Sequence, residues 1–279
     1  MHPYFDIIRP GNCALAAIGV VVGGVIAAGV NVLGITNLFQ LIFAMLVVFL
    51  STAGGNVLND YTDREVDKIN HPDRPIPSGK IKPRHAAIYA SALFATALPF
   101  AILAEHRIEL TSIFLIALLL MLAYEFRFKA EGLSGNLIVS LLTSMVFVFG
   151  GCAFGNPMLT IPFALISFLA SVYREIVKDI EDVEGDFTRK TLPKKVGKRT
   201  AGLMAISTLT LSIIFSPVPL LLPNFGFLPK VAYTIGIVAA DIVFIYSATF
   251  TFKSPSKAQK FAKIGMLLGT ISFLLIGLR

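Results

Sequence analysis

The chain has 279 residues, of which 55% are hydrophobic and only 15% are charged. With a mean hydropathy of +0.77 it is too apolar for an ordinary water-soluble domain. The formal net charge is +7, but the basic residues are divided among several separate loops, which argues against nucleic-acid binding. These figures predict an all-α membrane protein.

Nine apolar segments, each about as long as a membrane-crossing helix, follow one another along the chain. They cover approximately residues 12–34, 37–57, 86–104, 109–125, 133–154, 159–179, 199–217, 230–251 and 260–278. The first has no cleavage-like end, so we expect a retained span and not a signal peptide. Cys13 and Cys152 lie inside apolar segments, and we expect both to be packing residues.

The loops between these segments alternate between strongly charged and weakly charged. With the N-terminus on the charged side, all but three of the 24 Lys and Arg residues fall on that side. The exceptions are Arg107, Lys230 and Arg279. The positive-inside rule then predicts a multi-pass protein of the cell membrane, with the N-terminus and the charged loops in the cytoplasm and the C-terminus outside.

An acidic motif follows the second apolar segment, and its spacing is that of one face of a helix. Asn56, Asp60, Asp63 and Asp67 are separated by three or four residues, so they share a face if the helix continues. Asn59 lies beside that face.

A second acidic motif repeats this spacing after the sixth segment, at Asp179, Asp182 and Asp186. Both motifs end a span at the same predicted membrane face. We therefore expect one transmembrane domain, residues 1–279, made of two related halves of roughly residues 1–130 and 131–279.

Carboxylates stacked on one helical face repel one another and need a compensating cation. Hard oxygen ligands favour Mg²⁺, and two such clusters can hold a diphosphate through two bridging ions. The alternative is that these are solvated acids beside a membrane, but the repeated spacing favours metal. Basic residues near the motifs would neutralise phosphate oxygens that the metal ions leave uncovered: Arg64, Lys68, Arg74, Arg174 and Lys178.

The loop after the first motif, residues 70–81, contains three prolines and a glycine, which preclude a continuing helix. We interpret it as a stiff lid that excludes water and holds Arg74 near the phosphates. The alternative is a plain connector. His71 is expected to be a polar loop residue and not a metal ligand, because no second His lies at metal spacing.

The pattern NDxxDxxxD at Asn59–Asp67, DRPIPSG at Asp73–Gly79 and DxxDxxxD at Asp179–Asp186 resembles the UbiA superfamily of intramembrane prenyltransferases. Tyr124 and Lys129, five residues apart after the fourth segment, extend the resemblance. It implies a horseshoe of about nine helices around a central cavity, with a cytoplasmic cap and a lateral opening to lipid. It also implies Mg²⁺-dependent ionisation of an isoprenoid diphosphate.

The resemblance further implies roles for single residues. Metal ligands would be Asn59, Asp63 and Asp67 for one ion and Asp179, Asp182 and Asp186 for the other, with Asp60 matching the motif behind them. The residues expected to be catalytic are Asp63, Asp67, Asp182 and Lys129. The residues expected to bind substrate are Asn56, Arg64, Lys68, Arg74, Tyr124, Arg127, Lys129, Arg174 and Lys178.

Residues 174–186, with Thr191-Leu192-Pro193 following, are similar to the branch of this superfamily that builds archaeal ether lipids. This implies transfer of a geranylgeranyl group to the sn-2 hydroxyl of geranylgeranylglyceryl phosphate. Its partners would be the diphosphate donor, a lipid-like phosphate acceptor and membrane lipids. The alternative is an aromatic or quinone-precursor acceptor.

Asp241 lies in the middle of the eighth segment, where an acidic residue is usually functional. An ion-coupled transporter would explain it, but a transport site is expected near the membrane midplane, whereas both acidic motifs lie at the membrane face. For Asp241 we expect a hydrogen-bonded position facing the bundle.

Overall fold

The computed structural model describes residues 2–183 and 190–279, and within them nine helices are long and apolar enough to cross a membrane. They are α2 (Pro10–Ala28), α3 (Ile35–Thr62), α5 (Pro83–Leu103), α6 (Arg107–Phe126), α7 (Leu133–Ala153), α8 (Pro157–Asp182), α10 (Lys198–Phe215), α11 (Phe227–Thr249) and α12 (Pro255–Gly277). Short elements connect them: α1 (Pro3–Ile7), η1 (Gly29–Leu33), α4 (Arg64–Asn70), η2 (Phe128–Ala130), α9 (Leu192–Val196) and η3 (Val218–Leu221). The predicted nine-span, all-helical membrane fold is confirmed.

Proline marks the start of several spanning helices. Pro10, Pro83, Pro157 and Pro255 each occupy the first turn of their helix. Proline suits this position because its missing N–H would have no partner inside the helix anyway. These residues therefore define where each span begins after a loop.

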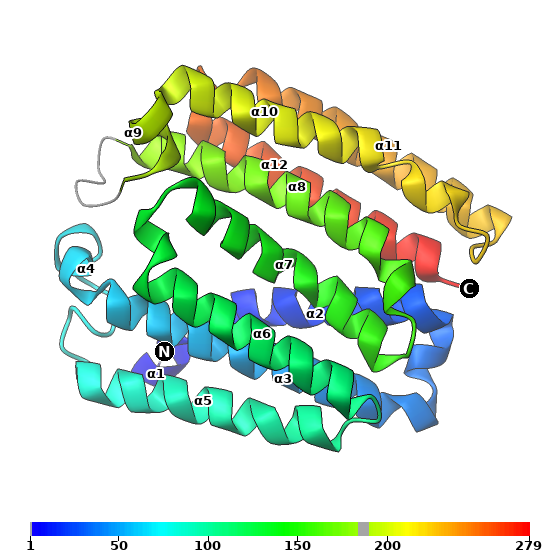
Figure 1. Cartoon of the computed structure of the whole chain (residues 1–279), viewed down its shortest axis with the longest axis horizontal. Coiled ribbons are helices and arrows are strands. Elements are labelled where there is room, and N and C mark those ends of the chain that lie inside the picture. The colour runs from blue at the N-terminus through cyan, green and yellow to red at the C-terminus, as the bar shows by residue number, and fades with distance from the viewer. Residues whose placement is uncertain (1, 184–189) are drawn as a thin grey trace.

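The long helices lie side by side, with their ends gathered at two opposite ends of the molecule (Figure 1). α7 packs against both α2 and α8, and α12 packs against α8 and α2. The α2–α7 contact is very close, since a Cβ atom added to Gly150 would lie 2.2 Å from the carbonyl oxygen of Val20. Small residues are typical where membrane helices approach closely.

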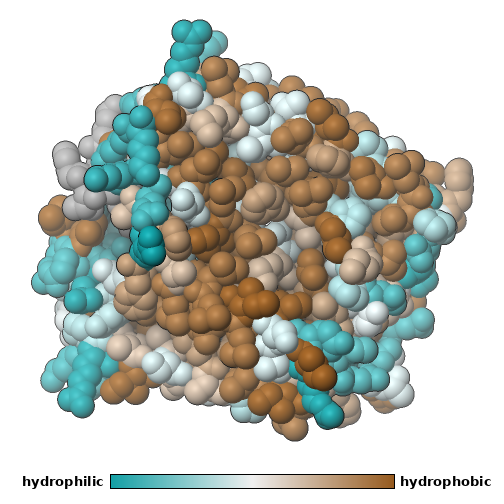
Figure 2. Space-filling model, viewed as in Figure 1, coloured by the Kyte–Doolittle hydropathy of each residue, from teal (hydrophilic) through white to brown (hydrophobic). Residues whose placement is uncertain are grey.

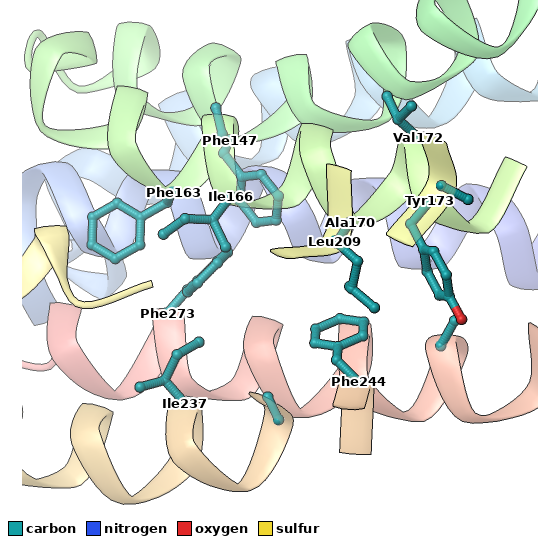
Figure 3. Packing of buried hydrophobic residues seen from close by; sticks show 14 of the residues in the cluster. Phe147, Phe163, Ile166, Ala170, Val172, Tyr173, Leu209, Ile237, Phe244 and Phe273 are labelled. Atoms are coloured by element: carbon teal, nitrogen blue, oxygen red, sulfur yellow. The ribbon is translucent and has the colours of Figure 1, made fainter. Parts of the chain in front are cut away.

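The core between α8, α11 and α12 is aromatic. The Phe163 ring meets Phe225, Tyr233 and Phe273 edge-on, and Phe273 makes a further edge contact with Phe147. Figure 3 shows Phe147, Phe163 and Phe273 together in this core. The contacts link α8 to α11 and α12, and α12 to α7. They fix the position of α8, which carries the second acidic motif.

Tyr173 and Asp241 have hydrogen-bond partners inside the bundle. The Tyr173 hydroxyl lies 2.9 Å from Ser247 Oγ, and Ser216 donates to Asp241 Oδ2 at 2.7 Å. The expected bundle-facing, hydrogen-bonded position of Asp241 is confirmed. Cys13 and Cys152 are buried and free, as expected of packing residues.

The surface carries a broad apolar band with hydrophilic residues gathered toward its edges (Figure 2). Large apolar side chains are exposed on the spanning helices, among them Ile42, Leu119, Ile235 and Ile242. Exposed apolar surface of this extent is expected where helices face lipid. The chain is a multi-pass membrane protein.

Candidate active site

The two acidic motifs lie at the same end of the helix bundle. α3 carries the first and α8 the second, and α4 and α9, which follow them, lie together at one end of the molecule (Figure 1). The continuous helix considered for the first motif is interrupted at Asp63, whose backbone stays helical and joins α3 to α4. Asp186 falls among residues 184–189, outside the described residues.

Arginine side chains neutralise the first motif. Arg9 forms an ion pair with Asp60, and the Arg74 guanidinium lies 3.5 Å from the same carboxylate. Arg74 also donates to Asp67 Oδ2 at 2.6 Å. Asp60 and Asp67 are both buried, so these cations offset charges that water cannot reach.

Arg9 reaches Asp60 from the start of α2 with an unusual backbone. Its φ of 52° makes it the one non-glycine residue with positive φ among the described residues. Such a conformation costs free energy and persists when surrounding contacts impose it. The neighbouring Ile8 carbonyl accepts from Asn56 Nδ2 at 2.7 Å, which fixes this turn against α3.

The proline-rich loop after α4 is built from turns, as its composition predicts. The Arg74 N–H donates to the His71 carbonyl at 3.1 Å, and the Ser78 N–H donates to the Arg74 carbonyl at 3.0 Å. Ile76 and Ile81 are buried in a cluster with residues of α3 and α5. Contacts with Asp60 and Asp67 place Arg74 at the acidic motif, while the expected position near the phosphates and the role of the loop as a lid stay predictions.

Lys129, in η2 just after α6, also contacts the first motif. Its ammonium lies 2.8 Å from Asp63 Oδ2 and 2.8 Å from Glu125 Oε2. It also stands over the Tyr124 ring at 5.9 Å. Glu125 in turn accepts from Asn59 Nδ2 at 2.9 Å, so α3 and α6 share one hydrogen-bonded network.

The second motif is held mainly by a neutral partner. Asn136 Nδ2, near the start of α7, donates to Asp179 Oδ2 at 2.8 Å. Arg174 pairs with Glu175, but its Nε is buried without a hydrogen-bond partner. Asp182, at the end of α8, is engaged in further contacts.

Other side chains that are predicted to bind substrate are more exposed to solvent than those of Arg74 and Lys129. The Arg127 side chain is 75% exposed and stacks on Phe128, with the centroid 5.3 Å away. Lys68 donates to Glu65 at 2.7 Å, and this hydrogen bond lowers the pKa of Glu65. Arg64 lies over the Tyr61 ring at 4.6 Å, and Lys178 approaches Glu175 at 4.0 Å. Their roles in binding stay predictions.

The donor chemistry of the site fits Mg²⁺. In the described part of the chain, no three acidic, His or Cys side chains form a ready-made metal cluster. Instead, the ammonium and guanidinium groups of Lys129 and Arg74 occupy carboxylate oxygens at ion-pair distance. These oxygens are hard ligands of the kind that Mg²⁺ takes together with substrate phosphate. The two cations thus contact carboxylates that are predicted to bind metal.

An apolar cavity of about 100 Å³ lies between α3, α6 and α7. Its walls are formed by Val47, Val48, Ser51, Thr52, Ile113, Phe114, Ala117, Met121, Leu142, Met145, Val146 and Phe149. Thr52 precedes Asn59 by seven residues on the same helix, which is about 10 Å along the axis. The acidic network and the apolar cavity therefore lie one above the other along α3.

The segments around both motifs also touch each other. The Lys190 N–H donates to the Ala130 carbonyl at 3.0 Å, and Lys195 Nζ donates to the Glu131 carbonyl at 2.8 Å. The loop that carries Lys129 thus contacts the chain that follows the second motif.

Three residues of the site were not predicted: Arg9, Glu125 and Asn136. Each is a polar residue beside the predicted cytoplasmic end of an apolar segment, and each contacts an acidic-motif residue from another helix. That shared location is the signal by which the sequence could have indicated them.

Related proteins are similar in sequence to almost the whole length of this chain. The chain is 37% identical to a digeranylgeranylglyceryl phosphate synthase of Methanosphaera stadtmanae, covering 98% of each chain. It is 38% identical to that of Methanopyrus kandleri, again covering 98% of each. A solved structure of digeranylgeranylglyceryl phosphate synthase, 36% identical, superposes with a TM-score of 0.82 and covers 99% of this chain and 98% of that one.

More distant structures share the fold. A UbiA homologue from Archaeoglobus fulgidus bound to GPP and Mg²⁺ has a TM-score of 0.69 at 17% identity, covering 97% of this chain and 99% of that one. The model of the UbiA prenyltransferase family matches residues 16–271. With the acidic motifs, the Tyr124–Lys129 pair and the nine spans in place, the chain is an enzyme that belongs to the UbiA prenyltransferase family.

Proposed function

We propose that this chain transfers a geranylgeranyl group from geranylgeranyl diphosphate to the sn-2 hydroxyl of geranylgeranylglyceryl phosphate. The product carries the second ether bond of an archaeal membrane lipid. The observation that carries this proposal is the network of carboxylates and cations at one end of an apolar cavity. The relatives named digeranylgeranylglyceryl phosphate synthase support the choice of substrates.

The donor diphosphate would bind between the two motifs. Asn59, Asp63 and Asp67 would hold one Mg²⁺, and Asp179, Asp182 and Asp186 the other. When bound, these ions draw negative charge onto the leaving diphosphate. A homologue of the same fold bound to GPP and Mg²⁺ supports an isoprenoid diphosphate donor and Mg²⁺.

The cations of the network would then change partners. Lys129 and Arg74 lie on Asp63 and Asp67, which are expected to be metal ligands. Once metal ions occupy these carboxylates, the ammonium and the guanidinium become available to diphosphate oxygens. Hydrogen bonds between such cations and phosphate are strong, and the fixed network needs little reorganisation during the reaction.

The bond between C1 of the donor and the bridging oxygen breaks, and both electrons leave with the diphosphate. The allylic cation that remains is attacked by the acceptor oxygen, which forms the ether bond and releases its hydroxyl proton. The cavity walls exclude water, which would otherwise capture the cation. Met121, Phe114 and Phe149 are among the side chains placed to do this.

The acceptor phosphate needs further cations. Arg174 has a buried Nε without a hydrogen-bond partner, and Lys178 lies one turn later on α8 with its side chain half exposed. A phosphate at this position would satisfy the Nε and balance the acceptor's charge. The site would face the cytoplasm, as the distribution of Lys and Arg predicts.

The test uses the purified chain in detergent with geranylgeranyl diphosphate, Mg²⁺ and one acceptor at a time. We expect a digeranylgeranylglyceryl phosphate product by mass spectrometry with geranylgeranylglyceryl phosphate, and no prenylated product with 4-hydroxybenzoate. Prenylation of the aromatic acid alone would refute the proposed acceptor. Release of diphosphate without either product would refute the transfer.

A further inference from the structure

The Glu125 carboxylate, in the last turn of α6, accepts hydrogen bonds from three side chains. Oε1 accepts from Asn59 Nδ2 at 2.9 Å, and Oε2 accepts from the Thr62 hydroxyl at 2.6 Å and from Lys129 Nζ at 2.8 Å. Glu125 is only 9% exposed. A buried carboxylate with this many donors is fixed in place and imposes an orientation on its partners.

For Asn59 the consequence is the direction of its oxygen. A side-chain amide donates from its nitrogen and accepts, or binds a cation, through its oxygen. Because Nδ2 is directed at Glu125, Oδ1 points away from it. Oδ1, the one atom of the Asn59 side chain that can bind a cation, is therefore left available to a cation at the acidic motif.

For Lys129 the consequence is that Glu125 stays its counter-ion when a metal ion binds. The ammonium lies at 2.8 Å from both Asp63 and Glu125. A metal ion on Asp63 would take away the first of these partners. Glu125 would remain, so Lys129 would keep its place beside the metal ion instead of competing with it for Asp63.

We infer that Glu125 is a positioning residue, which directs Asn59 Oδ1 toward the cation site and holds Lys129 beside it. This inference rests on the proposed prenyl transfer at the same site. Glu125 itself has both oxygens occupied by protein donors, so it is not assigned as a ligand. Mutating a residue that hydrogen-bonds to a metal ligand typically lowers metal affinity or activity by about 10- to 100-fold.

The first experiment measures Mn²⁺ binding by electron paramagnetic resonance, in detergent and without substrate. Glu125→Gln keeps the shape but loses the charge, and its amide N–H would oppose the donors of Thr62 and Lys129. We expect Mn²⁺ binding about 10- to 100-fold weaker than in the parent. Glu109→Gln is the matched control, because Glu109 is an exposed residue in the first turn of the same helix, about 24 Å away.

A second variant guards against a folding defect. Glu125→Asp keeps the charge beside Lys129 but is one methylene too short to reach Asn59. It is also expected to weaken Mn²⁺ binding, and thermal unfolding of each variant shows that it is folded. Unchanged Mn²⁺ affinity in both folded variants would overturn the inference.

The sharpest test reverses the hydrogen bond. Asn59→Asp alone places two carboxylates opposite each other and should not bind Mn²⁺ more tightly despite its added charge. In the double variant with Glu125→Gln, the new amide can donate to the new carboxylate, and the total charge equals that of the parent. We expect the double variant to bind Mn²⁺ about tenfold more tightly than Glu125→Gln alone. Additive effects of the two substitutions would overturn the inference.

Kinetics separate this inference from the proposed function. If Glu125 acts through Asn59 and Lys129, the Mg²⁺ concentration for half-maximal rate should rise in Glu125→Gln, and excess Mg²⁺ should restore part of kcat. A fall in kcat that Mg²⁺ does not change would contradict the positioning role. If the parent chain makes no ether product, the proposed function fails, while the Mn²⁺ experiments still decide the role of Glu125.

Discussion

Arg74→Ala tests whether cations of the chain stand in for metal ions at the first motif. The substitution removes the guanidinium that lies 2.6 Å from Asp67 and 3.5 Å from Asp60. Both carboxylates would stay buried with less compensation. Asp60 would keep its ion pair with Arg9, but Asp67 would lose its ion pair with Arg74.

The cost follows from burial. Removing one partner of a buried ion pair typically destabilises a protein by about 3–5 kcal/mol. The Asp67 side chain is 5% exposed, but that of Arg74 is 29% exposed, so water already weakens the pair. We therefore expect a loss of about 2–3 kcal/mol without metal, or a fall in the thermal midpoint of about 3–5 °C.

Mg²⁺ should reverse much of this loss, because it binds the carboxylates that Arg74 has left. The assay is thermal unfolding in detergent, with and without Mg²⁺, for the parent, Arg74→Ala and Arg127→Ala. Arg127 is the control, because its exposed contact with Glu131 at 3.9 Å should change stability by less than about 1 kcal/mol. An unchanged midpoint for Arg74→Ala without metal, or equal stabilisation of all three by Mg²⁺, would refute the reasoning.

Three further predictions address the metal ligands, the cavity and the helix packing. Asp63→Ala and Asp182→Ala should each abolish turnover while the protein stays folded, and near-normal rates of product formation would exclude the proposed clamp. Ala117→Phe should fill the cavity wall and lower the rate with the C20 donor more than with a C10 donor, measured as a ratio of kcat/KM. Gly150→Ala should destabilise the α2–α7 contact by about 3 kcal/mol or more, because its Cβ would lie 2.2 Å from the Val20 carbonyl oxygen; an unchanged unfolding midpoint would show that the helices can separate.

The sequence predicted those features that depend on local pattern. The nine spans follow from runs of apolar residues, and their number is confirmed. The spacing of Asp60, Asp63 and Asp67 predicted one helical face, but the helix is interrupted at Asp63, between α3 and α4. Arg74 lies near the first motif because the loop that follows this motif is short and stiffened by proline.

The remaining features depend on which helices become neighbours. Glu125 and Asn59 are 66 positions apart, and Asn136 and Asp179 are 43 positions apart. Apolar periodicity does not specify the partner of a given helix face, because lipid and protein neighbours are equally apolar. The cavity residues could not be predicted for the same reason, since three helices contribute to one wall.

The network around the first motif explains how so many carboxylates can lie together without metal. Ion pairs join the carboxylates of Asp60, Asp63, Asp67 and Glu125 to the cations of Arg9, Arg74 and Lys129. Four negative charges face three positive ones, so the network is close to neutral and can remain buried. A diphosphate alone would add several negative charges to this balance. Metal ions would offset these charges, so the donor and the metal ions would each raise the affinity of the site for the other by the same factor.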